Sequence, residues 1–146
     1  MNPLCELLRE HAAIRALTAR FELEATRGET EGEIDGEAIG RLLAFFEHEV
    51  DGHHQEKEEC ILLPCLSARV HGLERELVVS LGSDHARQRK ILAHISNQLE
   101  SASWGEPNSL RVLAAEARRL PWVSRALNPA SVQASPVRRF ACTMRR

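Results

Sequence analysis

Hydrophobic side chains recur at steps of three and four residues along most of the first 120 positions, which is the spacing of one face of an α-helix. The stretch Gly28–Gly36 is rich in Gly and Glu and predicts a loop. Pro64 and Pro121 are expected to end helices, and Ser109 is a favourable N-cap residue for the last helix. The pattern therefore predicts four helices, over about Pro3–Arg27, Glu37–Leu63, Glu74–Ser103 and Ser109–Leu120. Long helices with short-to-moderate connections predict an all-α fold, an antiparallel four-helix bundle whose fourth helix is shortened.

Polar residues of a restricted kind interrupt the first three apolar stripes. They are His11 in the first helix, His54 and Glu58 in the second, and His85 in the third. His54 and Glu58 are four residues apart, so both side chains leave one helix face. A desolvated imidazole or carboxylate costs several kcal/mol without partners. If the three faces converge, these residues form a ligand set for iron, manganese or zinc.

Two other interpretations of these four residues stay open at this stage. A metal-free polar network in the core would fix the register of the helices and leave the protein as a helical interaction module. Zinc-dependent hydrolysis would use the same ligands, but Glu59 is the only evident general base.

The segments around these positions resemble the motifs of the hemerythrin-like (HHE cation-binding) domain family. In the family's second-helix signature a His pair precedes Lys-Glu-Glu and Leu-Phe-Pro, whereas here Gln55 stands at the second His and Leu63 replaces Phe. The resemblance covers roughly residues 4–120. It is carried by Leu7–Ile14, Phe45-Phe46, Asp51, His54, Lys57-Glu58-Glu59, Leu62–Pro64 and Asp84-His85.

The resemblance implies a four-helix bundle with a non-haem iron site, usually two irons bridged by carboxylates. Carried over by position, it makes His11, His54, Glu58 and His85 the metal ligands, with Glu58 as the bridge. It implies binding of oxygen, nitric oxide or peroxide, a role in redox sensing or a role in iron handling, and it leaves open whether the protein is an enzyme.

The family's fourth helix supplies a further His and, four residues later, a Glu, and this chain lacks that pair. Its last histidine is His94 and its last acidic residue is Glu116. We therefore expect weakened or mononuclear metal binding and an impaired function.

Charge divides the chain near the end of the fourth predicted helix. Residues 1–116 hold all 21 acidic residues and 12 of the 19 Lys and Arg, a net charge of −9, whereas residues 117–146 carry +7. Three of the six prolines also lie after residue 120. We therefore predict a helical bundle over residues 1–120 and an irregular or disordered basic tail over residues 121–146.

A shortened fourth helix would expose apolar surface on the other three helices, and such surface favours association. We expect a homodimer, an unstable monomer, or partial coverage by the tail residues Trp122, Val123 and Leu127.

The remaining composition excludes several classes of protein. No apolar run approaches the ~20 residues that cross a bilayer, and the N-terminus lacks a basic signal-peptide region, so we expect a cytoplasmic protein without membrane contact. Aromatic residues make up 4% of the chain, which disfavours nucleic-acid binding by base stacking. We expect Cys60 and Cys65 to be buried. We expect His53 either to be exposed or to contact a metal ligand without touching the metal. We expect Arg89 to lie on a helix face that is exposed to solvent.

Overall fold

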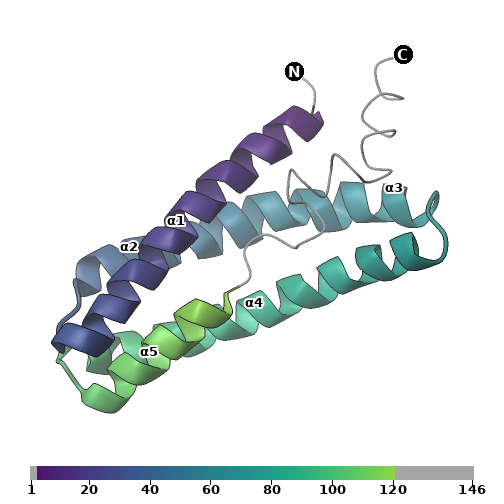
Figure 1. The fold of residues 1–146 in the computed structure, drawn as a ribbon. Helices are drawn as coiled ribbons and strands as arrows, with labels where there is room; N and C mark the ends of the chain where they lie inside the picture. Colours follow the sequence, from purple (N-terminus) through teal and green to yellow (C-terminus); the bar gives the residue numbers. More distant parts are fainter. Residues whose placement is uncertain (1–2, 121–146) are drawn as a thin grey trace.

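A computed structural model describes residues 3–120, and Figure 1 shows that they are helical over nearly their whole length. The stretch from residue 36 to residue 67 is helical without a break, and we call it the second helical column. No strand occurs in residues 3–120, so the predicted all-α class is confirmed for this part of the chain. The helices are α1 (Pro3–Glu31), α2 (Gly36–Phe45), the π-helices η1 (Phe46–Gln55) and η2 (Glu58–Leu62), α3 (Leu63–Ser67), α4 (Leu73–Ser103) and α5 (Pro107–Arg119).

The connections between helices lie at both ends of the structure. In Figure 1 the turns from α1 to α2 and from α4 to α5 share one end, and the turn from α3 to α4 forms the other. The short helix α5 packs on α1 and α4. Because the second helical column contacts both α1 and α4, it presents two different faces to two neighbours.

An apolar core joins α1, the second helical column, α4 and α5. Its largest fully buried side chains include Phe21, Phe46, Ile39, Ile95 and Leu113, which come from five different helices. The rings of Phe21 and Phe46 meet edge to face with centroids 6.0 Å apart. Each such side chain stabilises the fold by about 1.5–3 kcal/mol through burial, so these contacts fix how the helices sit against one another.

The first helix runs four residues beyond its predicted end, through Glu31. The apolar stripe continues through Ala25 and reaches Gly28, which is buried. A Cβ at Gly28 would overlap the side chain of Ile34, so the absence of a side chain lets the loop pack closely against the helix. Gly28 therefore serves close packing within the helix and does not begin the loop that the sequence predicts.

The prediction that Pro64 ends the second helix is wrong. The helical column passes through Pro64 and ends at Ser67. Pro64 occupies the first turn of α3, directly after the π-helical turn η2, where its missing N–H is tolerated. Ile61 follows Glu58 by three residues, a spacing that would place it on the same stripe in an α-helix. It is 64% exposed, because π-helical turns hold more residues than α-helical turns and shift the stripe out of register.

The fourth helix begins two residues earlier than predicted. Its cap is Glu106, whose carboxylate accepts hydrogen bonds from the backbone N–H groups of Asn108 and Ser109 at 3.0 and 2.5 Å. Ser109 lies inside the helix and is buried. A carboxylate at a helix N-terminus also interacts favourably with the helix dipole, so Glu106 replaces Ser109 as the cap.

Cys60 is exposed and Cys65 is half-buried, so the expectation that both are buried is wrong. None of the helices within residues 3–120 is both long and apolar enough to cross a membrane. The predicted tail over residues 121–146, with Trp122, Val123 and Leu127, lies outside the described residues.

Candidate metal centre

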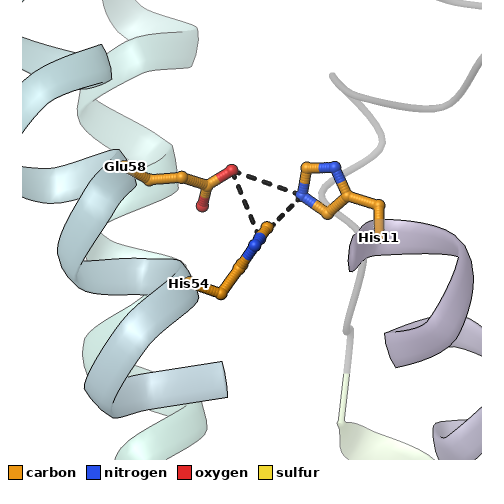
Figure 2. A group of neighbouring side chains, drawn as sticks. All are labelled: His11, His54 and Glu58. Atoms are coloured by element: carbon orange, nitrogen blue, oxygen red, sulfur yellow. Dashed lines mark hydrogen bonds and ion pairs between the residues drawn. The ribbon is translucent and has the colours of Figure 1, made fainter. Parts of the chain in front are cut away.

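Three buried side chains from two parts of the chain meet between α1 and the second helical column, as Figure 2 shows. α1 contributes His11, η1 contributes His54 and η2 contributes Glu58. Their exposed fractions are 5%, 4% and 3%, so all three are shielded from water. No other group of three metal-ligating side chains occurs in the part of the chain that the structure describes.

The donor atoms of these residues are spaced as ligands of one ion would be. Nε2 of His11 lies 3.0 Å from Nε2 of His54 and 3.2 Å from Oε1 of Glu58. Nε2 of His54 lies 3.5 Å from the same oxygen. Two ligand atoms about 2.1 Å from an ion are about 3.0 Å apart at a right angle and about 3.4 Å apart at a tetrahedral angle. The distances between the three donor atoms therefore match those between ligands of one cation.

One oxygen of Glu58 lacks a hydrogen bond. Within residues 3–120, Oε1 of Glu58 is buried and no contact that it makes has hydrogen-bond geometry. Buried carboxylate oxygens are normally satisfied, because an unpaired one keeps the cost of its desolvation. A cation beside Oε1 would supply the missing interaction.

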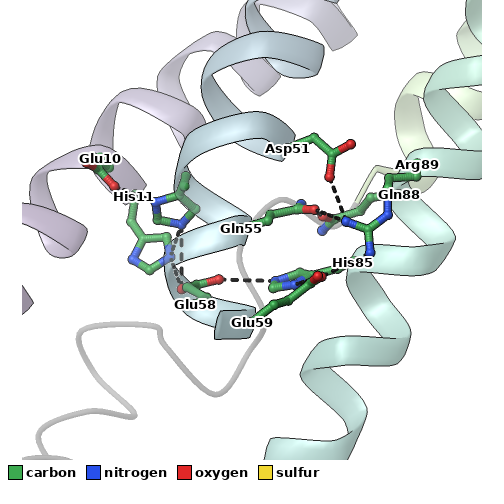
Figure 3. Close-up of polar contacts among 10 residues, drawn as sticks. Glu10, His11, Asp51, Gln55, Glu58, Glu59, His85, Gln88 and Arg89 are labelled. Carbon is green, nitrogen blue, oxygen red and sulfur yellow. Dashed lines mark hydrogen bonds and ion pairs between the residues drawn. The ribbon is translucent and has the colours of Figure 1, made fainter. Parts of the chain in front are cut away.

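His85 contacts the other oxygen of Glu58. Its Nε2 lies 3.1 Å from Oε2, on the side away from His11, as Figure 3 shows. His85 is 6% exposed and extends from α4. The structure thus brings all four predicted residues together, with three in one compact group and His85 across the carboxylate.

Glu10 and Glu59 each orient one histidine, and we call them the outer carboxylates because they contact a histidine on the side away from Glu58. Nδ1 of His54 donates to Glu10 at 2.7 Å, and Glu10 also accepts from Lys57 at 2.7 Å. Nδ1 of His85 donates to Glu59 at 2.9 Å. A carboxylate on Nδ1 fixes the imidazole orientation and directs Nε2 inward, an arrangement common around metal sites.

The charged states on the two sides of Glu58 differ. Burial acts to raise the pKa of Glu58, but contacts with the His11 and His85 imidazoles outweigh it and lower that pKa to about 2. Burial lowers the pKa of His54. Burial acts in the same direction on His85, but its hydrogen bonds to Glu58 and Glu59 outweigh it and raise its pKa. At neutral pH Glu58 is therefore ionised, and His54 keeps a lone pair for a cation.

A second polar row follows the face of the second helical column that meets α4. It consists of Asp51, Gln55 and Glu59, spaced four residues apart, and Figure 3 shows it facing Arg89. The Arg89 guanidinium donates to Asp51 at 2.6 Å, to Gln55 at 3.2 Å and to Glu59 at 3.0 Å. The expectation that Arg89 lies on a merely solvated face is therefore wrong.

Sequence reasoning missed Glu10 and Lys57 as partners of the site. Glu10 precedes His11, and Lys57 precedes Glu58, so neither lies on the stripe that carries the ligands. The available signal was the run Lys57-Glu58-Glu59. Consecutive helical residues point in different directions, so the charged neighbours on either side of Glu58 indicate polar partners on more than one face of the helix. His53 is exposed, and its Nδ1 bonds to the backbone carbonyl of His48 at 2.7 Å.

A pocket of about 280 Å³ borders the site between α1 and η1. His54, Glu10 and Lys57 contribute its polar wall, and Ile14, Phe45 and Val50 contribute apolar surface. This volume is just below the range of pockets that hold drug-sized ligands.

A known protein family matches this part of the chain. The family model described as the hemerythrin HHE cation-binding domain matches residues 2–122. No curated protein and no solved structure matches the chain.

Proposed function

Because the chain belongs to the hemerythrin HHE cation-binding domain family, we propose that it binds a non-haem iron ion through His11, His54 and Glu58. The observation that carries this proposal is the meeting of three buried donors around an oxygen of Glu58 that accepts no hydrogen bond. In this proposal His85 holds the far oxygen of Glu58, and α5 is a shortened counterpart of the fourth helix of an antiparallel bundle.

The residues of this chain have distinct tasks in the proposal. Glu58 supplies the negative charge that offsets the ion, and its low pKa keeps that charge at neutral pH. Glu10 holds the proton of His54 on Nδ1, so that Nε2 remains a donor to the ion. Burial of all three ligands excludes water and strengthens their electrostatic interactions.

We further propose that the partner is a small molecule such as oxygen, nitric oxide or a peroxide, and that the protein serves ligand binding, redox sensing or iron handling. An iron ion held by few protein ligands supplies open coordination positions for such a molecule. The pocket beside His54 offers space next to the site for such a molecule.

A metal-free polar core is the competing function, and the hydrogen bonds do not favour it. Within the described residues, Nδ1 of His11 and Oε1 of Glu58 are buried without hydrogen-bond partners. A network that serves only to fix helix register is expected to satisfy its members, because a partly satisfied buried network destabilises the fold.

The proposal is tested by the iron content of the untagged protein. We expect iron in the purified protein or after anaerobic loading, and an absorbance band when oxygen or azide is added. His54→Ala should lose the iron, whereas His53→Ala should keep it, because His53 is exposed and its Nδ1 bonds to the backbone carbonyl of His48. A folded wild-type protein that takes up no iron after loading would overturn the proposal and favour the metal-free core.

A further inference from the structure

The two oxygens of Glu58 have unequal numbers of imidazole nitrogens beside them. Oε1 is close to two imidazole nitrogens, those of His11 and His54. Oε2 is close to one, that of His85. A cation on the Oε2 side would need further donors from neighbouring residues.

A row of oxygen donors on the face toward α4 is already engaged. Asp51, Gln55 and Glu59 all accept hydrogen bonds from Arg89, at 2.6, 3.2 and 3.0 Å. The two carboxylates form ion pairs with the guanidinium, and Arg89 remains protonated at any accessible pH. The row therefore presents its oxygens to a fixed cation, and a metal ion would have to displace it.

The position of Arg89 explains why one side chain engages all three oxygens. The row residues are spaced four apart, so their side chains leave one face of the second helical column. The guanidinium has five N–H donors in a planar fork and extends from α4, four residues after His85. It thus lies against the row beside the one imidazole on that side.

We propose that Arg89 limits the centre to a single metal ion, by holding the oxygen donors of the Oε2 side that a second ion would require. This inference rests on the proposed function and adds to it the number of ions and the residue that sets it. Arg89 acts as a specificity-determining residue that does not itself touch the ion.

The test is metal stoichiometry in wild type and in Arg89→Met, which keeps the aliphatic stem and removes the charge and the donors. Fe²⁺ is titrated anaerobically into the metal-free protein, and Mn²⁺ is titrated in parallel with its electron paramagnetic resonance spectrum recorded. We expect one ion per chain in wild type and a second binding event in Arg89→Met, accompanied by a spin-coupled Mn²⁺ signal. Arg87→Met is the matched control. Arg87 is exposed, and within residues 3–120 its ion pair is with Asp84. The Arg87→Met protein should therefore bind one ion per chain, as wild type does.

Two ions per chain in wild type, or one ion in folded Arg89→Met, would overturn the inference. No ion in wild type would instead overturn the proposed function, so the two failures are distinguishable. Should Arg89→Met not fold, the wild-type stoichiometry still tests the inference, and Arg89→Gln gives a second neutral variant in which the second binding event is expected.

Discussion

The two sides of Glu58 are built from the same residue types and yet differ in what they offer a cation. On the Oε1 side, Nε2 of His54 faces Nε2 of His11 at 3.0 Å. On the Oε2 side, His85 bonds to carboxylates through both ring nitrogens.

An imidazole that donates from both nitrogens has no lone pair left, whereas one that donates only from Nδ1 remains a ligand. Burial lowers the pKa of His54, whereas the hydrogen bonds of His85 to Glu58 and Glu59 outweigh burial and raise the pKa of His85. The comparison shows that the presence of a histidine beside a carboxylate does not define a metal ligand. What matters is whether the imidazole keeps a ring nitrogen that no carboxylate engages.

The largest expected effect concerns the residue shared by both sides. The pKa of Glu58 is about 2 in the fold, against an ordinary value of 4.5. Because the folded pKa is depressed, the stabilisation is present above pH 4.5 and is lost as the pH falls toward 2. In metal-free protein we expect wild type to lose about 3 kcal/mol more of its free energy of unfolding than Glu58→Gln does, between pH 5 and 2.

Chemical denaturation at a series of pH values measures this difference. Glu56→Gln is the control, since Glu56 is exposed on the same helical column and should follow wild type. Equal acid sensitivity in wild type and Glu58→Gln would show that the imidazoles do not stabilise the Glu58 carboxylate, and the contrast between its two sides would lose its basis.

The next effect separates the two sides directly. With the ion on the Oε1 side, His11→Ala removes a ligand, whereas His85→Ala removes a hydrogen bond to the far oxygen of a ligand. We expect metal affinity to fall by at least about 100-fold in His11→Ala and by about 10-fold in His85→Ala, since outer partners contribute about 10–100-fold. Competition against a chelator of known affinity measures both values. If His85→Ala weakens binding as much as His11→Ala, His85 is a ligand and the two sides are equivalent.

The four inward residues were predictable because each lies on the apolar stripe of its helix. His11, His54, Glu58 and His85 replace hydrophobic residues at stripe positions, and a buried polar residue at such a position needs a partner. The structure places all four within one connected group.

The outer residues were not predictable by the same reasoning. A stripe marks one face of a helix, but the second helical column contacts α1 on one face and α4 on another. Gln55 and Glu59 belong to the second face, and only the packing of the helices shows that this face meets Arg89. The π-helical turns η1 and η2 were also not predictable, because no local propensity in the sequence marks them.

The smallest expected effect compares the two outer carboxylates. Glu10 orients His54, a ligand in our proposal, while Glu59 orients His85, which is not. Glu10→Gln keeps the size of the side chain but weakens the charge-assisted hydrogen bond to Nδ1, so we expect about 10-fold weaker metal binding, the lower end of the range for such partners. Glu59→Gln should change metal affinity less than Glu10→Gln, and it should lower the pKa of His85 because one of the two carboxylates that raise it is lost.

Two measurements keep these effects apart. Chelator competition gives the metal affinities, and NMR titration of the imidazole resonances in metal-free protein gives the pKa of His85. Lys57 pairs with Glu10 and Arg89 pairs with Glu59, so both variants also release a cation, and the comparison is matched in that respect. A larger loss of affinity in Glu59→Gln than in Glu10→Gln would place the ion on the His85 side of Glu58 and reverse the assignment of the two sides.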